Sequence, residues 1–313
     1  MAAIQTHGLT KRYGHDIYAV DDLSLTVEEG EVFGFLGPNG AGKSTTIDVL
    51  LDYVRPTAGS ATVLGYDAQR EAAEIHQRVG ILPDGYSLYD RLTGREHVEF
   101  ATNMKGVDDD PDEILHRVGL DSTAAARPAG TYSKGMSQRL ALGMALVGNP
   151  EVLVLDEPSS GLDPDGIRDI REITREHAAD GGTVFFSSHI LSQVEAVCDR
   201  VGILNRGRLV AVDSVSGLRD ALGTSSTITL TVDTPPTGIS VDGIEGVTEV
   251  TIEEDVVRAT CTEPAAKVAV IDRVRAAGST IVDIETEQAS LEDLFSEYTH
   301  PDARTEAVPE AVR

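Results

Sequence analysis

The segment Gly37-Pro-Asn-Gly-Ala-Gly-Lys-Ser-Thr45 constrains the fold more than any other part of the chain. It follows the apolar run Glu31–Leu36. Apolar side chains recur at helical spacing after it, at Ile47, Leu50, Leu51 and Val54. A glycine-rich loop between a strand and a helix matches the phosphate-binding pattern, in which backbone N–H groups and a helix N-terminus face an anion. The sequence therefore predicts an α/β nucleotide-binding domain.

Every residue of this loop is a candidate nucleotide ligand: Gly37, Pro38, Asn39, Gly40, Ala41, Gly42, Lys43, Ser44 and Thr45. We expect Lys43 to reach the β- and γ-phosphates and the Ser44 hydroxyl to bind Mg²⁺. The sequence lacks the motif Asn-Lys-x-Asp with which GTPases recognise guanine. ATP with Mg²⁺ is therefore the expected ligand.

Two carboxylates follow the apolar run Val152–Leu155, which is typical of a strand buried inside a parallel sheet. Asp156 and Glu157 are thus expected at the carboxyl edge of the sheet, where open α/β folds bind ligands. Asp156 is suited to hold Mg²⁺ through water, and Glu157 to accept the proton of a water that attacks the γ-phosphate. Without the phosphate loop, such a pair would more often cap a helix or face solvent.

The remaining pattern predicts two domains. Strands alternating with helices, including a second buried strand at Val184–Ser187, indicate a largely parallel sheet over residues 1–220. Helical patches without a convincing strand indicate an inserted helical subdomain at about 85–135. Alternation at period two then predicts a small α+β domain over 226–298. A polar, acidic stretch over 302–313 is expected to be a disordered tail.

The charge balance limits the possible partners. With 52 acidic and 26 basic side chains, the formal net charge is −26. Nucleic-acid binding relies on clustered Lys and Arg, and only five of the basic residues are lysine, so we expect no nucleic-acid partner. A composition that is acidic, poor in lysine and free of tryptophan suggests a halophilic protein, because in molar salt a Debye length of about 3 Å screens self-repulsion. The alternative is an ordinary acidic cytosolic protein.

The sequence pattern predicts neither a membrane span nor a targeting signal. No uncharged apolar run approaches the roughly 18 residues of a membrane span, and no basic stretch precedes an apolar one at the N-terminus. Cys198 and Cys261 lie far apart without metal-type spacing. We expect both to be small buried side chains of a protein in a reducing cytoplasm.

The segment Tyr132-Ser-Lys-Gly-Met-Ser-Gln-Arg139 resembles the signature motif of ABC ATPases, in the variant of many drug- and export-type members. Asp156–Pro158 resembles the Walker B box of that family, Ser160–Asp163 its D-loop, and Ser187–His189 its switch-histidine strand. These motifs follow the family's order and spacing over roughly residues 4–215. The sequence is thus identified as a member of the ABC ATPases.

The resemblance implies roles for further residues. Tyr13 occupies the position of the aromatic side chain that stacks on adenine, and His189 that of the histidine that contacts the γ-phosphate and orients the attacking water. Ser133 can cap the helix that follows it, so that the helix dipole faces an anion. In the family, Ser133, Gly135 and Asp163 would face the ATP of a second ATPase subunit. The resemblance therefore implies a head-to-tail dimer, in the simplest case a homodimer, with two ATP molecules at its interface.

One position departs from the family pattern. Ile81-Leu-Pro-Asp84 aligns with the Q-loop, where the family usually has Gln and some exporters have Glu. Asp84 can still accept a Mg²⁺-bound water, but its carboxylate reaches less far, and we keep it as a candidate metal ligand. The alternative is an ordinary Pro-Asp-Gly turn.

As a whole, the resemblance implies the ATP-hydrolysing subunit of an ABC transporter of the drug-export or ABC-2 group. The ending Ala289–Phe295 resembles the close of such subunits. A separate membrane-spanning permease would hold this subunit at the cytoplasmic face of the cell membrane. Candidate permease contacts in the helical region, unless they are buried in its core, are Tyr86, Leu88, Tyr89 and Leu92.

A second function from another class stays open at this point, that of a soluble ABC ATPase in translation or DNA maintenance. Translation factors of this kind usually carry two ATPase domains, and DNA-maintenance members carry long coiled coils. This chain has one set of motifs and no sustained heptads. The transporter is therefore the leading hypothesis.

Overall fold

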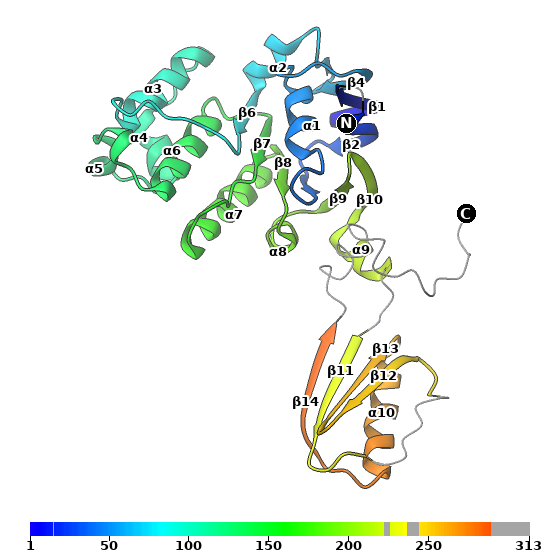
Figure 1. Ribbon diagram of the computed structural model, residues 1–313. Coiled ribbons are helices and arrows are strands. Elements are labelled where there is room, and N and C mark those ends of the chain that lie inside the picture. The colour runs from blue at the N-terminus through cyan, green and yellow to red at the C-terminus, as the bar shows by residue number, and fades with distance from the viewer. Residues whose placement is uncertain (15, 222–225, 237–243, 289–313) are drawn as a thin grey trace. The chain divides into compact units, whose positions relative to one another are not determined.

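A computed structural model describes residues 1–14, 16–221, 226–236 and 244–288 of the chain. The chain divides into two compact units, Met1–Ser214 with two sheets and a second unit with one sheet that begins at Val215 (Figure 1). The exporter-like ending Ala289–Phe295 and the acidic stretch 302–313 lie outside the described residues.

The first unit is built on a six-stranded sheet with the order β10-β9-β3-β8-β7-β6. Its strands are β3 (Val32–Leu36), β6 (Val79–Leu82), β7 (Val152–Asp156), β8 (Thr183–Ser188), β9 (Arg200–Asn205) and β10 (Arg208–Ser214). All neighbours in it are parallel except β9 and β10. Every residue of β3, β7 and β8 is buried, as a parallel sheet covered on both faces requires. The predicted α/β fold with a largely parallel sheet is confirmed.

Packing on the sheet differs between its two faces. Phe33 and Phe35 on one face share a core with Ile47 of α1 (Lys43–Leu50). On the other face Gly34 faces Val194 of α8 (Leu191–Glu195), and a Cβ at this glycine would lie 2.4 Å from the valine methyl. The absence of a side chain at Gly34 therefore lets α8 approach the strand that leads into the phosphate loop.

An antiparallel sheet, not anticipated from the sequence, covers the same core. Its strands, in the order β2-β1-β4-β5, are β1 (Ala2–Tyr13), β2 (Ile17–Glu28), β4 (Ala58–Val63) and β5 (Tyr66–Asp67). Leu9 and Leu23, opposite each other in the β1–β2 register, are completely buried against that core. The hairpin of β1 and β2 thus forms one wall beside α1.

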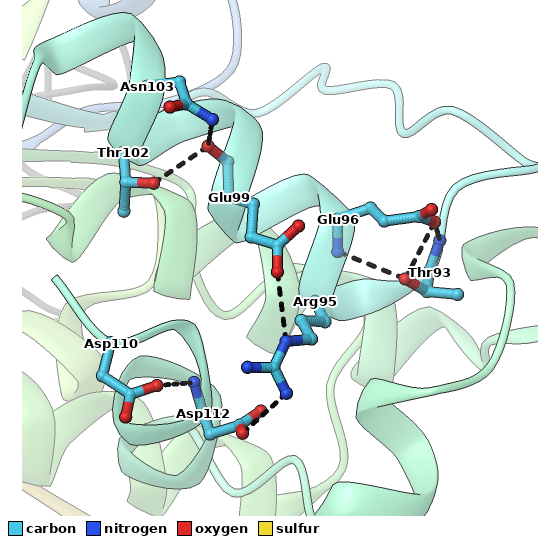
Figure 2. Close-up of polar contacts among 8 residues, drawn as sticks. All are labelled: Thr93, Arg95, Glu96, Glu99, Thr102, Asn103, Asp110 and Asp112. Carbon is cyan, nitrogen blue, oxygen red and sulfur yellow. Dashed lines mark hydrogen bonds and ion pairs between the residues drawn. The ribbon is translucent and has the colours of Figure 1, made fainter. Parts of the chain in front are cut away.

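Three helices lie within the segment of about 85–135 that the sequence predicts to be a helical insertion, and a fourth begins at its end. The three are α3 (Gly94–Lys105), α4 (Pro111–Arg117) and α5 (Ser122–Ala125), and the fourth is α6 (Lys134–Leu146). Helix α3 begins with a capping box, in which Thr93 Oγ1 accepts from Glu96 N at 3.2 Å and Glu96 Oε2 accepts from Thr93 N at 2.7 Å (Figure 2). The guanidinium of Arg95 bonds Glu99 on the same helix and Asp112 on α4. These contacts fix α3 against α4.

Two further helices complete the first unit. Helix α2 (Ala72–Arg78) leads into β6, and α7 (Pro164–Ala179) connects β7 to β8. Gly181 has φ +90° directly after the end of α7. The stop that the sequence predicts at Gly181-Gly182 is confirmed, because a left-handed residue there suits glycine.

The second unit is a four-stranded antiparallel sheet with the order β12-β13-β11-β14. Its elements are α9 (Val215–Ala221), β11 (Ser226–Val232), β12 (Val247–Glu253), β13 (Val256–Cys261), α10 (Pro264–Ala276) and β14 (Ile281–Gln288). Leu230 and Val257 pack with Val270 of α10 in its core. The sequence did not reveal β13, because the turn before it places Glu254 at φ +48° without the Asn-Gly or Asp-Gly pair that usually marks a hairpin.

Candidate active site

Two glycines determine the backbone conformation of the phosphate loop. Gly42 is the N-cap of α1 with φ +109°, and a Cβ there would lie 2.0 Å from the Ala19 carbonyl oxygen of β2. Gly40 has φ +81°. Both positions therefore require glycine, and the loop lies directly against the β1–β2 hairpin.

Lys43 is the cation of this loop. Its side chain is only 6% exposed, and Nζ donates to the Gly37 carbonyl at 2.7 Å. The same Nζ lies 3.1 Å from Oε1 of Glu157, which is itself 12% exposed. The structure thus brings the predicted phosphate-binding lysine and the predicted general base into direct contact.

Glu157 sits in an unusual backbone conformation. Its φ of +49° lies in the left-handed region, which a side chain with a Cβ rarely adopts. The Glu157 N–H donates to the Ser187 carbonyl at 3.2 Å, which helps to hold this turn after β7. The second carboxylate oxygen, Oε2, lies 2.8 Å from Nδ1 of His189. The carboxylate therefore bridges Lys43 and His189 across the carboxyl edge of the sheet.

Asp156 occupies the last position of β7 and is 4% exposed. Its Oδ1 accepts a short hydrogen bond from the Ser187 hydroxyl of β8. Burial raises the pKa of Asp48 on α1, and the charge of Asp156 raises it further. The charge of Asp156 is the smaller of these two causes, and a cation beside Asp156 would offset it. Oxygen donors such as the Asp156 carboxylate and the Ser44 hydroxyl are those that Mg²⁺ prefers, so these residues fit the predicted ion.

Asp84 follows β6 and lines a pocket of about 430 Å³ together with Glu157, Lys134 and Gln138. The departure from the family pattern therefore lies beside the predicted general base. Tyr86 and Leu88, predicted as permease contacts, line the same pocket. A metal contact of Asp84 stays a prediction.

Two helix N-termini meet in a different pocket. Ser133 Oγ accepts from Met136 N at 3.2 Å at the start of α6, which confirms the predicted cap. Asp163 Oδ1 accepts from Gly166 N at 2.9 Å at the start of α7. Both caps and Gly135 line a pocket of about 510 Å³. Each cap leaves other N–H groups of its first turn free to face an anion.

Tyr13 ends β1 and is 42% exposed. Lys11 Nζ lies 4.9 Å from the centroid of its ring and donates to the Arg55 carbonyl at 2.8 Å. Ala19 of the same hairpin lies against Gly42, so the hairpin that carries Tyr13 borders the phosphate loop. Stacking of adenine on Tyr13 stays a prediction.

Two polar residues of the site went unassigned in the sequence. Ser187 bonds Asp156, and the buried Gln138 Nε2 donates to the Pro158 carbonyl at 2.9 Å. A hydroxyl at the end of an apolar strand was the available signal for Ser187. Gln138 lies within the signature-like segment Tyr132–Arg139, which was the available signal, but its partner on a loop 20 residues away could not be read from that segment.

The structure also describes the two cysteines and allows a search for helices that could cross a membrane. Cys198 and Cys261 are buried and free, as expected, and burial raises the pKa of both thiols. Among the residues that the structure describes, no helix combines the length and apolar character needed to cross a membrane.

Known proteins resemble this chain over about two thirds of its length. The family model described as ABC transporter matches residues 20–160. The uncharacterized ABC transporter ATP-binding protein YhcH of Bacillus subtilis (strain 168) is 43% identical over 202 residues, which are 63% of this chain and 65% of its own length. The fluoroquinolones export ATP-binding protein MT2762 of Mycobacterium tuberculosis (strain CDC 1551 / Oshkosh) is 40% identical over 220 residues, which are 70% of this chain and 73% of its own.

A solved structure shares the same architecture. The ATP-binding cassette MJ0796, in a dimeric post-hydrolysis state bound to ADP and Pi, superposes with a TM-score of 0.63 at 25% identity. The match covers 68% of this chain and 98% of that cassette. The similarity therefore extends over a complete nucleotide-binding cassette.

Proposed function

The chain belongs to the ABC transporter family as an ATP-binding and ATP-hydrolysing subunit, and on that premise we propose an export system in which it works as a dimer on a separate permease. The contact of Glu157 with both Lys43 and His189 carries this proposal. The contact supports the proposal because the three side chains proposed as base, phosphate-binding cation and water-orienting imidazole meet at the carboxyl edge of one sheet.

In the proposed reaction Lys43 binds the β- and γ-phosphates, and the N–H groups of the loop contact the phosphate oxygens. A water oxygen attacks the γ-phosphorus while Glu157 accepts one of its protons. The bond from the γ-phosphorus to the bridging oxygen breaks, and its electron pair leaves with ADP. His189 orients the water and contacts the γ-phosphate.

Ser44 and Asp156 would hold Mg²⁺, with Asp84 as a candidate for a water-mediated contact. The ion would neutralise charge on the β- and γ-phosphates. Ser187 orients the Asp156 carboxylate through its hydroxyl and so belongs to the proposed site as a supporting residue.

The second subunit completes the site in this proposal. Ser133, Gly135 and Asp163 line a pocket that contains neither Lys43 nor Glu157. A head-to-tail dimer would bring this pocket over the γ-phosphate bound by the other copy. The dimeric cassette among the similar structures supports this arrangement.

The Glu157→Gln variant tests the proposal. It keeps the size of the side chain but loses the base, so we expect ATP hydrolysis to fall by about 100-fold or more. ATP binding should persist, because Lys43 and the loop are unchanged. ATP that is bound but not hydrolysed should then hold two copies together. Gel filtration with and without ATP would detect this dimer.

Glu151→Gln is the matched control, since Glu151 is a half-exposed side chain just before β7 that pairs with Arg78. Its hydrolysis and oligomeric state should equal those of the wild type. Steady-state hydrolysis by the Glu157→Gln variant at the wild-type rate would exclude Glu157 as the base.

We further propose that a permease binds the apolar pocket of about 320 Å³ on the first unit, between β6, α3 and α6. Its lining includes the exposed side chains Tyr53, Phe100 and Met104. Exposed aromatic and methionine side chains around a pocket are typical of a surface that binds a partner. This binding would place the chain at the cytoplasmic face of the membrane. The alternative role in translation or DNA maintenance has no comparable support.

A further inference from the structure

Arg139 joins three separate elements of the helical region. It lies on α6 and forms an ion pair with Asp169 on α7. Its Nη1 also donates to the carbonyl oxygens of Val118 at 3.5 Å and Gly119 at 3.4 Å, in the turn between α4 and α5. One guanidinium thus links α6 both to α7 and to the α4–α5 turn.

The α4–α5 turn is shaped to receive this side chain. Gly119 has φ +73°, and a Cβ on it would lie 2.1 Å from Nη1 of Arg139. The guanidinium therefore lies directly over the glycine. Arg139 is 27% exposed and Asp169 37% exposed, so the pair is partly shielded from solvent. A planar group with several fixed donors suits such a three-way contact better than a lysine would.

Further contacts align α6 with the segment that leads into α7. The buried Gln138 amide bonds the Pro158 carbonyl. A Cβ at Gly135 would lie 3.7 Å from Leu162, so Leu162 packs closely on the first turn of α6. Arg139 and Asp169 form the ionic contact between the bodies of the same two helices. These three contacts together determine how the N-termini of the two helices, at Ser133 and Asp163, are placed relative to each other.

We propose that Arg139 is a positioning residue for the composite ATP site. Together with Asp169 it would hold the N-termini of α6 and α7 in one arrangement, so that both reach the nucleotide of the second subunit at the same time. The inference rests on the proposed dimer. Arg139 lines the same pocket as Ser133 and Asp163, and in this proposal it acts by holding the two N-termini in place; a displacement of about 1 Å at such groups can reduce turnover by as much as 100-fold.

The test uses Arg139→Met and Asp169→Asn, each in the wild-type chain and in the Glu157→Gln chain. ATP affinity of the monomer, measured with a fluorescent ATP analogue, should stay within about twofold, because the pocket that Arg139 lines contains no residue of the phosphate loop. The ATP concentration that half-saturates dimer formation should rise by about tenfold or more, and turnover should fall by a similar factor.

Arg168→Met is the matched control. Arg168 lies beside Asp169 on α7 but pairs with Asp165 at 3.4 Å, and both side chains are more than 70% exposed. This variant should dimerise at the wild-type ATP concentration. The reversed pair, Arg139→Asp with Asp169→Arg, should recover part of the dimerisation that Asp169→Arg alone loses, which a general loss of stability would not produce.

The outcomes separate this inference from the function on which it rests. If the Glu157→Gln chain stays monomeric with ATP, the proposed dimer is wrong and the inference falls with it. If that chain dimerises and folded Asp169→Asn dimerises equally well, only the role of the pair is overturned. Equal losses of monomer ATP binding and dimerisation would also overturn it. Should Arg139→Met fail to fold, Asp169→Asn and the reversed pair decide the question.

Discussion

His177 shows how a single buried side chain couples folding to pH. It lies near the end of α7 and is 1% exposed, in a space that depends on Gly182, where a Cβ would lie 2.4 Å from its Nε2. Burial lowers the pKa of His177, and the positive charge of Arg117 lowers it further. The folded protein therefore binds a proton at this site less readily than the unfolded chain.

The sign of the resulting pH dependence follows from this difference. The stability that comes from a neutral His177 is complete above the pKa of the unfolded histidine, about 6.5. It is lost as the pH falls from there through the lower pKa of the folded state. In urea unfolding between pH 8 and pH 5, the free energy of unfolding should therefore fall more steeply for the wild type than for His177→Asn.

The exposed His116, on α4, provides the comparison. His116→Asn should leave the wild-type slope of stability against pH nearly unchanged. Equal slopes for the wild type and His177→Asn would show that His177 contributes nothing to the acid sensitivity.

Most residues of the site could be predicted from the sequence, but the contacts between them could not. Lys43, Asp156 and Glu157 are predicted from a glycine-rich loop and a buried strand, and His189 from the family resemblance; the structure brings Lys43, Glu157 and His189 together. The left-handed φ of Glu157 and the hydrogen bond from Ser187 to Asp156 depend on two strands far apart in sequence. No local pattern encodes such a pairing.

At the scale of elements, α3 combines a firm attachment with an exposed apolar surface. The capping box at Thr93 and the links from Arg95 to Glu99 and Asp112 fix its N-terminal half (Figure 2). Near its other end, Phe100 is 46% exposed and Met104 67% exposed. A helix held at one end that presents apolar side chains on an outer face is suited to bind a partner.

Replacing both Phe100 and Met104 by alanine should remove the proposed permease contact without unfolding the chain. Because Phe100 is 46% exposed and Met104 67% exposed, we expect the change in stability not to exceed about 1 kcal/mol. A tagged chain should then recover much less permease from detergent-solubilised membranes of its own cells. Asn103→Ala, on the same helix, is the control, and equal recovery by all three proteins would contradict the proposed docking surface.

Helices and strands with a clear hydrophobic pattern could be predicted from the sequence, and irregular ones could not. Strands β3, β7 and β8 were found because each is a continuous apolar run beside a motif. The hairpin of β1 and β2 was missed, because register shifts interrupt its pairing, and residues such as Asp22 adopt positive φ within it. Irregular strands of this kind are stabilised by tertiary packing rather than by local alternation.

For the whole molecule, the dominant quantity is the net charge of −26. Asp156 is the one acidic side chain that is buried among the residues that the structure describes. The other described carboxylates lie at least partly in solvent, where they repel one another and where salt can screen them. Salt adaptation stays a prediction, and this distribution of charge is what it requires.

We expect the denaturation midpoint to rise substantially between 0.1 M and 3 M KCl. A variant with Glu249→Gln, Glu253→Gln, Asp283→Asn and Glu285→Gln, all exposed, has a net charge of −26 + 4 = −22. Its midpoint should depend less on salt than that of the wild type, because less repulsion remains to be screened. Equal stability of the wild type at both salt concentrations would contradict salt adaptation.

The contact between Gly42 and Ala19 has a consequence for the kind of ligand that the chain can select. It fixes the spacing between the phosphate loop and the hairpin that carries Tyr13, so the distance between these two parts of the site is set by the backbone. A nucleoside triphosphate long enough to span this distance would be held at both ends, whereas inorganic triphosphate would be held at one. The site would then select ligands by length without movement of the loop, because the backbone already determines the spacing between the loop and the hairpin.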